Sequence, residues 1–323
     1  MGGLPRPEEA GDIWSRIWHE EAHNSTAIEG NTLVLREVEQ LLKTGQVVGR
    51  KELKEYLEVK AYAEAAKWVY EQAHADRDGG QLITLQEVRH IHSLAVSLVW
   101  EVEPPANATP EESPGNWRRH NIEPFEGGMR PPDHTQIPAL MADWIKNANA
   151  INSPGNAHVV ERVARLHADF ECIHPFLDGN GRAGRLLMNL LLVRMGYPPL
   201  IIRNRVRRGY LRALHRADRG DAALLGELLA RAILENLMRF VLPAVAGDVK
   251  LLPLESLVTT VLTLPALRNA AQRGRLRAVR SGDGSWRSSK QWVREYRKSR
   301  WSTLKTRRKT RSRGTKAATA PSN

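Results

Sequence analysis

The sequence predicts an all-α fold for most of the chain, and three observations support this prediction. Apolar residues recur at helical spacing in seven separate stretches, as expected for amphipathic helices that share a core. Clusters of proline and glycine separate these stretches, and β-strand signals are weak and local. A hydrophobic content of 41% in 323 residues is enough for a substantial core. The stretches are Val38–Leu42, Leu53–His74, Leu85–Trp100, Ile137–Ala148, His158–Ile173, Arg185–Met195 and Ala222–Phe240.

Composition limits the compartment and the class of protein. The single cysteine, Cys172, leaves no partner for an intrachain disulfide, which fits a reducing cytoplasm, so a cytoplasmic location is expected. No stretch approaches the apolar length of a membrane span, so no membrane partner is expected. Residues 1–14 carry acidic side chains and lack an apolar run, so we expect no signal peptide.

The formal net charge of +12 is distributed unevenly along the chain. Residues 265–323 contain 18 Lys and Arg against 2 Asp and Glu, whereas residues 1–264 contain 30 against 34. A mildly acidic body with a strongly basic end indicates an attached module that binds nucleic acid or another acidic surface.

The N-terminal region, residues 1–110, is expected to be helical and to contain one notable motif. Ser25 and Glu29 are four residues apart, so they share one face of a helix expected over about residues 20–31. Gly30 is suited to end that helix. Taken alone, this pattern is also typical of a capped surface turn.

The segment His174–Arg185 (HPFLDGNGRAGR) concentrates a titratable base, a carboxylate, a glycine-rich turn and two arginines before an apolar run. A glycine-rich turn that opens a helix binds anions, because free N–H groups and the positive end of the helix dipole point at the same place. Gly179 and Gly181 permit positive φ and close approach of a phosphate. Arg182 and Arg185 share one helix face, so together they can bind a polyphosphate.

Two further residues of this segment complete the chemistry. Asp178 is a lone carboxylate beside the expected phosphates, a setting in which Mg²⁺ binds through one carboxylate and substrate oxygens. His174 has an unperturbed pKa near neutrality, so it can accept a proton from an attacking hydroxyl.

The segment resembles the signature of the Fic family, and every signature position is filled. The resemblance implies a Fic-type helical bundle that transfers AMP from ATP to a protein hydroxyl and releases pyrophosphate. It implies that His174 is the general base, that Asp178 binds Mg²⁺ and that Phe176 anchors the loop in the core. The nucleotide-binding residues that it implies are Gly179, Asn180, Gly181, Arg182, Ala183, Gly184 and Arg185, with the two arginines on the β- and γ-phosphates.

The resemblance extends over the body and places the catalytic core at residues 111–247. Residues of about 115–132 look like the family's flap, expected as a short β-hairpin that holds an unidentified target protein by strand-like pairing. The part Glu123–Gly128 is longer than usual and contains a proline. Tyr210 and Asp218 lie where the family contacts adenine or ribose, although Tyr210 fits an ordinary core tyrosine equally well.

Ahead of the signature, Ser25, Glu29 and Gly30 match the family's inhibitory motif. The resemblance implies that Glu29 pairs bidentately with Arg185 and occupies the place of the γ-phosphate. ATP would then bind with its α-phosphate poorly aligned for attack. This class often self-associates, so the resemblance allows a homodimer, and the sequence leaves the oligomeric state open.

Residues 248–300 are expected to form a small separate module, and residues 301–323 a disordered basic tail. Helical patterns at Leu251–Leu257 and Pro265–Ala271, a turn with strand-like flanks and a helix at Gln291–Tyr296 resemble an excisionase-like winged helix-turn-helix. The resemblance implies a second helix in the major groove of DNA and a wing on the backbone. The arginines expected on the binding side are Arg268, Arg273, Arg275, Arg277 and Arg280.

Hypotheses from two classes follow. The first is an enzyme, a Mg²⁺-dependent protein adenylyltransferase (a nucleotidyltransferase) that uses ATP and is auto-inhibited by Glu29. A variant of this hypothesis is a bifunctional enzyme that also removes AMP. The second is a DNA-binding regulator whose body acts as a nucleotide sensor.

Overall fold

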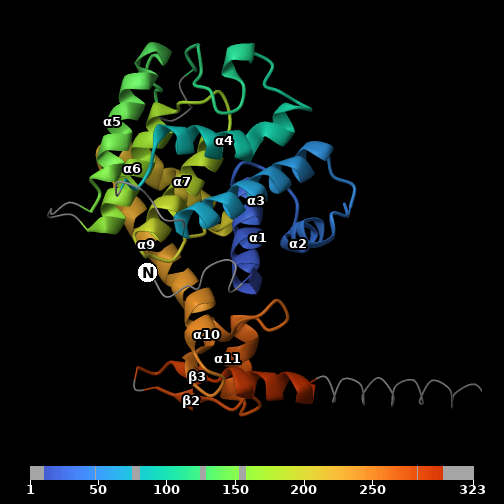
Figure 1. Ribbon diagram of the computed structural model, residues 1–323. Coiled ribbons are helices and arrows are strands. Elements are labelled where there is room, and N and C mark those ends of the chain that lie inside the picture. Colours follow the sequence, from blue (N-terminus) through green and yellow to red (C-terminus); the bar gives the residue numbers. More distant parts are fainter. Residues whose placement is uncertain are drawn as a thin grey trace, which may run out of the picture. The chain divides into compact units, whose positions relative to one another are not determined.

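The structure is a computed structural model that describes residues 11–47, 49–74, 81–123, 129–152, 158–281 and 283–300. These residues are mostly helical, which confirms the all-α class (Figure 1). The chain divides into two compact units, residues 1–236 and 237–323, and each is described by itself. Within the described ranges, no helix combines the length and the apolar character needed to cross a membrane.

The first unit is a helical bundle. In chain order it contains α1 (Gly11–Ile28), α2 (Leu35–Thr44), α3 (Leu53–His74), α4 (Leu85–Trp100), α5 (Ile137–Asn149), α6 (Val159–Ile173), α7 (Asn180–Arg194), α8 (Arg207–Ala217) and α9 (Ala223–Asn236). Single 3₁₀ turns lie at η2 (Pro110–Glu112), η3 (His134–Gln136) and η4 (Asn204–Val206).

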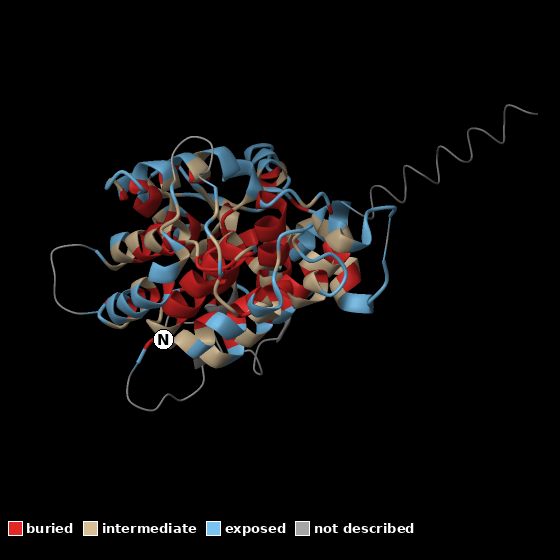
Figure 2. Ribbon diagram, turned by 90° about the horizontal axis from the view of Figure 1, so that it is seen from above, coloured by how far each residue is buried: buried red, intermediate tan, exposed pale blue. Residues whose placement is uncertain are grey.

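Helix α7 is the central element of this bundle. Almost all of its residues are buried, because α3, α4 and α6 pack around it (Figures 1 and 2). Figure 2 shows the buried residues gathered on the inner helices and the exposed residues on the outer ones. The site signature therefore opens the most enclosed helix of the unit, which gives its first turn a rigid support.

Local sequence explains where several helices begin and end. The hydroxyl of Thr84 accepts from the Glu87 backbone N–H at 3.2 Å, and the Glu87 carboxylate accepts from the Thr84 N–H at 2.9 Å, so a capping box starts α4. Helix α1 ends at Ile28, two residues before Gly30, whose φ of +111° lies in the region that glycine favours. The helix expected over 20–31 thus begins earlier and stops three residues sooner.

The flap differs from expectation in its described part. Residues 124–128, the tip of the expected hairpin, lie outside the described residues. The flanks at 115–123 and 129–132 contain no strand. Side chains connect them instead, because Asn121 donates to Asp133 at 2.9 Å and accepts from the His134 N–H at 2.9 Å.

The second unit contains a small sheet and short helices. In chain order it comprises a π-helical turn η5 (Leu237–Val241), α10 (Leu242–Val245), β1 (Leu252–Pro253), η6 (Leu254–Leu257), α11 (Leu264–Gln272), β2 (Val279–Arg280), β3 (Trp286–Ser288) and a helix at 290–300. The strands pair antiparallel in the order β1-β3-β2, with Leu252 opposite Ser288 and Val279 opposite Arg287. The expected tail, 301–323, lies outside the described residues.

The core of the second unit is formed by side chains of β1, η6, α11, the helix at 290–300 and the segments between them, including Leu252, Leu254, Leu267, Leu276 and Val293. The helix expected over 251–257 is a strand followed by a 3₁₀ turn. Pro253 explains the change, because it lacks the N–H that a helix interior needs.

Candidate functional site

The loop between α6 and α7 brings the signature residues together. His174 ends α6 with φ 49°, and it is the one non-glycine residue with positive φ among the described residues. Gly179 precedes α7 with φ 78°. Strained backbone of this kind persists only where surrounding contacts enforce it, which makes the loop a candidate site.

Two contacts hold the loop from inside. The side-chain amide of Asn180 accepts from the Phe176 N–H at 2.9 Å and donates to the Phe176 carbonyl at 2.8 Å. The Phe176 ring is fully buried and stacks on His92, with centroids 3.6 Å apart. Phe176 therefore anchors the loop in the core. The Asn180 side chain holds the backbone of the loop, so the Asn180 backbone N–H, at the start of α7, is left for an anion.

His92, on α4, is a supporting residue that the sequence did not reveal. Its Nε2 donates to the Asp178 carbonyl at 2.8 Å, while its Nδ1 accepts from the Gly115 N–H at 2.9 Å. Burial lowers the pKa of His92 to about 4, so the ring is neutral and this pair of roles is fixed. His92 thereby connects the start of the flap to the signature loop.

Arg118 is the second such residue, although it lies in the segment that indicated the flap. Its side chain is buried, and its guanidinium donates to the carbonyls of His174 at 2.9 Å, His120 at 2.9 Å and Pro132 at 2.6 Å. It therefore fixes the backbone of His174 and both flanks of the flap at once. The one available signal was its place directly after Gly115-Asn-Trp, where it is the first of two adjacent arginines.

We predict that Gly179→Ala lowers the free energy of unfolding by about 2–4 kcal/mol, from left-handed strain and overpacking. A Cβ at this position would lie 2.4 Å from the Val96 Cγ1, on a backbone with φ 78°. Urea denaturation of purified protein measures the change. The matched control is Gly209→Ala on α8, where an added Cβ meets no atom within 4 Å and stability should rise slightly. Equal stability of the two variants would contradict the geometry.

The His174 ring lies in a partly buried position at the end of α6. Its Nδ1 lies 3.2 Å from the Glu171 carbonyl, which can only accept, so Nδ1 carries the proton and Nε2 the lone pair. Burial lowers the pKa of His174 to about 4. The ring is therefore neutral at physiological pH and has the protonation state that a general base requires.

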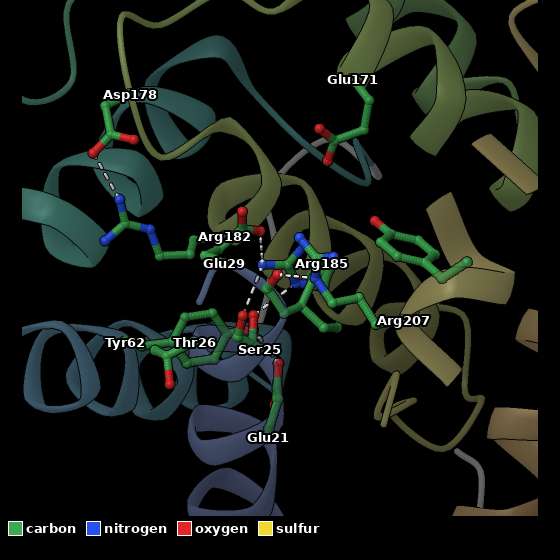
Figure 3. A network of polar contacts seen from close by, with 12 residues as sticks. Glu21, Ser25, Thr26, Glu29, Tyr62, Glu171, Asp178, Arg182, Arg185 and Arg207 are labelled. Atoms are coloured by element: carbon green, nitrogen blue, oxygen red, sulfur yellow. Dashed lines mark hydrogen bonds and ion pairs between the residues drawn. The ribbon is translucent and has the colours of Figure 1, made fainter. Parts of the chain in front are cut away.

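Arg182 and Asp178 form an ion pair at the mouth of the loop. The Arg182 Nη2 lies 2.8 Å from the Asp178 Oδ2 (Figure 3). Burial alone would raise the pKa of Asp178, but Arg182 and the Gly179 N–H lower it below its ordinary value. The Nε and Nη1 of Arg182 are buried and have no hydrogen-bond partner among the described residues. These two donors are not used by the described protein groups and can therefore bind an anionic ligand.

Arg185 is occupied by the N-terminal motif. Its Nε donates to the Ser25 Oγ at 2.6 Å, and its Nη2 donates to the Glu29 Oε1 at 2.6 Å and the Ser25 carbonyl at 3.1 Å (Figure 3). The expected bidentate pairing with Glu29 is wrong, because Ser25 engages the Nε. The Arg185 side chain is 4% exposed and that of Glu29 is 41% exposed, so the carboxylate lies at the solvent side of a buried cation.

The remaining expected site residues lie in different settings. Tyr210 is buried and its hydroxyl lies 2.6 Å from the Nε2 of His167, whereas Asp218 is exposed at the end of α8. Ala183 is fully buried within α7. At Gly184 a Cβ would lie 2.4 Å from the Glu171 Oε1, so this glycine makes room for a carboxyl group.

Residues 82–192, which include the signature, match the model of the Fic/DOC family. The chain is 32% identical over 204 residues to the protein adenylyltransferase Fic of Drosophila yakuba and 31% identical over 207 residues to that of Drosophila willistoni. Each match covers 63% of this chain and 38% of the relative, so the chain spans well under half the length of these proteins.

Solved structures show the same fold. A Fic domain containing signaling protein from Bacteroides thetaiotaomicron is 27% identical with a TM-score of 0.58, and the match covers 71% of this chain and 89% of that one. Fic-1 from C. elegans has a TM-score of 0.62 at 23% identity, with 74% of this chain and 66% of that one covered.

Proposed function

We propose that this chain is a protein adenylyltransferase that transfers AMP from ATP to a hydroxyl group of a target protein, and that Glu29 auto-inhibits it. The observation that carries the proposal is the state of Arg185. This buried arginine, at the position expected for the γ-phosphate, is bound by Glu29 across 156 residues of sequence. A carboxylate that takes the place of the γ-phosphate on Arg185 explains why the chain contains both the signature at 174–185 and the N-terminal motif with Glu29.

The residues of the loop support a direct in-line transfer. The N–H groups that open α7, with Arg182 and Arg185, provide donors for the phosphate oxygens of ATP. His174 accepts the proton of the target hydroxyl at Nε2 as the hydroxyl oxygen bonds to the α-phosphorus. The bond from the α-phosphorus to the bridging oxygen breaks, and pyrophosphate leaves.

Asp178 is proposed to hold Mg²⁺. Its side chain is half exposed and its lowered pKa keeps it ionised, which suits a cation that binds through one carboxylate and substrate oxygens. The described residues contain no cluster of three or more metal-ligating side chains, so Asp178 would bind the ion together with ATP. When bound, Mg²⁺ neutralises phosphate charge. Once Asp178 binds the ion, its ion pair with Arg182 would break, and Arg182 could contact the phosphates.

The acid limb of the pH profile is expected to lie near pH 4. Because burial lowers the pKa of His174 to about 4, the neutral base persists above that pH and is lost as pH falls through it. The measurement is kcat/KM of a Glu29→Gly variant between about pH 3 and 8, with circular dichroism at each pH to confirm folding. A limb near 6.5, the ordinary histidine value, would contradict the assignment.

The proposal is tested by finding which phosphate of ATP is transferred to protein. Glu29→Gly protein is incubated with Mg²⁺ and either α-labelled or γ-labelled ATP. AMP transfer predicts that protein acquires the α label and that the γ label appears in pyrophosphate. Label from the γ-phosphate on protein would indicate a phosphotransferase instead.

The second unit supports a separate binding role, which we propose is DNA binding by a winged helix-turn-helix. Helix α11 exposes Arg268, Asn269, Gln272 and Arg273, side chains of the types that contact bases and phosphates. A mobility-shift assay of the full chain on duplex DNA checks this. We also propose that the flap binds the target protein, that the chain self-associates and that it removes AMP as well as adding it.

A further inference from the structure

Helix α1 meets α7 at successive turns, through residues spaced by four. Glu21 accepts from the Nδ2 of Asn189 at 2.8 Å, and Ser25 accepts from the Nε of Arg185 at 2.6 Å. Glu29 accepts from the Nη2 of Arg185 at 2.6 Å. From Glu21 to Ser25 the α1 position rises by four, while its partner on α7 falls by four, from Asn189 to Arg185.

The contact between Glu29 and Arg185 depends on the absence of a side chain at Gly181. A Cβ at Gly181 would lie 2.5 Å from the Glu29 Oε1 and 3.0 Å from the Arg185 Nη1. The carboxylate of Glu29 thus lies directly against the first turn of α7. A shift of α1 by one residue, about 1.5 Å along its axis, would move this carboxylate out of reach of its partner.

Glu21 is the most enclosed contact of the series. It is 3% exposed, and it accepts from the hydroxyls of Tyr62, at 2.9 Å, and Tyr70 as well as from Asn189. Both tyrosines come from α3 and are fully buried. Figure 3 shows Glu21 below Ser25 on α1, with Tyr62 to the left at the height of Ser25.

The donors that hold Glu21 are themselves fixed. The side chain of Asn189 also accepts from the Leu200 N–H at 2.8 Å and donates to the Leu200 carbonyl at 3.0 Å. The Tyr70 ring packs on Trp14 with centroids 4.8 Å apart. Glu21 is therefore attached to rigid groups, whereas Glu29 lies in the turn after α1 and is partly exposed.

A second row of contacts lies along the segment that leads to α8. The Glu20 carboxylate pairs with Arg203 at 2.8 Å, and the side-chain oxygen of Asn24 accepts from the Asn204 N–H at 3.0 Å. The Nε of Arg207 donates to the Ile28 carbonyl at 2.6 Å. These contacts keep α1 on the body when the Glu21 contacts are lost, so weakening Glu21 should loosen the register without detaching the helix.

We infer that Glu21 is a positioning residue of the inhibitory contact, which fixes the register of α1 on α7 so that Glu29 reaches Arg185. The inference rests on the proposed auto-inhibition. Glutamine at this position keeps one acceptor for Tyr62 and Asn189 and can donate to the Tyr70 hydroxyl, so Glu21→Gln preserves the register. Glu21→Ala removes all three hydrogen bonds.

The experiment compares adenylylation rates of the full chain with Glu21→Ala, Glu21→Gln, Glu29→Gly and the Glu21→Ala/Glu29→Gly double variant. Glu21→Ala should raise the basal rate roughly tenfold, the net effect of losing about one hydrogen bond, and Glu21→Gln should stay near wild type. The double variant should match Glu29→Gly. A Glu21→Ala rate at the wild-type level, or a similar Glu21→Ala effect in both backgrounds, would overturn the inference.

The matched control is Glu87→Ala, which removes a different, partly buried carboxylate of the same unit that pairs with Arg194 at 2.7 Å. It should leave the basal rate unchanged. Hydrogen exchange of the backbone over residues 25–31 gives a readout independent of activity. Faster exchange in Glu21→Ala than in Glu87→Ala supports the inference, and equal exchange refutes it.

An inactive Glu29→Gly variant would refute the proposed function rather than the register, which hydrogen exchange still tests. If Glu21→Ala fails to fold, Tyr70→Phe provides the second variant. It removes one of the three hydrogen bonds and keeps the ring, so a smaller rise in rate and in exchange is expected. No change in either readout would count against the inference.

Discussion

Replacing His174 by alanine in a Glu29→Gly background is expected to lower the rate of AMP transfer by roughly 10²–10⁴-fold, the usual contribution of a general base. The loss is chemical rather than structural. Arg118 holds the His174 backbone by donating to its carbonyl, and the Asn180 side chain holds the start of α7 by accepting from the Phe176 N–H. Neither contact involves the His174 ring. ATP binding should therefore persist, because the phosphate donors lie on the first turn of α7.

The measurement pairs single-turnover labelling with a binding isotherm for ATP. A suitable control is His215→Ala, an exposed histidine on α8 that should change neither quantity. Transfer that survives in the His174 variant would remove this residue as the base. Loss of ATP affinity together with transfer would show that the variant disturbs the loop, and the role would then need another variant.

Glu29→Gly is expected to raise the rate of AMP transfer by about 10²-fold over wild type, the scale of an ångström of misalignment at the reacting phosphorus. The variant removes one anion from Arg185 and leaves Ser25 in contact with the same guanidinium. The site should therefore stay formed while the γ-phosphate gains its partner. Glu29 is 41% exposed on its side chain, so the change should have little effect on stability.

Initial rates with saturating ATP and Mg²⁺ measure this difference. Glu227→Gly makes a matched control, because it removes an exposed carboxylate that pairs with Arg231 on α9 and leaves the site unchanged. Equal rates for wild type and Glu29→Gly would contradict the inhibitory role and leave the Arg185 contact as a structural ion pair.

Helices with a strong apolar period could be predicted closely from the sequence. The stretches expected at Leu53–His74 and Leu85–Trp100 coincide with α3 and α4. Helix α7 begins five residues before the expected Arg185, because the glycines of the signature disguise its first turn. Glycine weakens a helix pattern, but here the helix is fixed by tertiary contacts.

Helix α1 shows why the rest could not be predicted. The helix gives no clear apolar stripe, since its buried face includes His19, Glu20, Glu21 and Asn24. Polar residues are buried there only because specific partners on other elements satisfy them. A single sequence contains the residues but not the pairing, so the length of α1 and the Glu21 contacts became visible only in three dimensions.

The candidate site divides in the same way. The signature could be recognised because base, carboxylate, glycines and arginines are adjacent in sequence. Its supports could not, since His92 and Arg118 reach the loop from positions more than 50 residues away and act through backbone carbonyls. The roles of the signature residues stay predictions until they are measured.

The most direct test of the account is mass spectrometry of Glu29→Gly protein incubated with ATP, Mg²⁺ and a cell lysate. The account predicts that hydroxyl side chains, on the protein itself or on lysate proteins, gain the mass of AMP, and that wild-type protein produces far less of this product. Unmodified proteins in the presence of folded Glu29→Gly that binds ATP would contradict it.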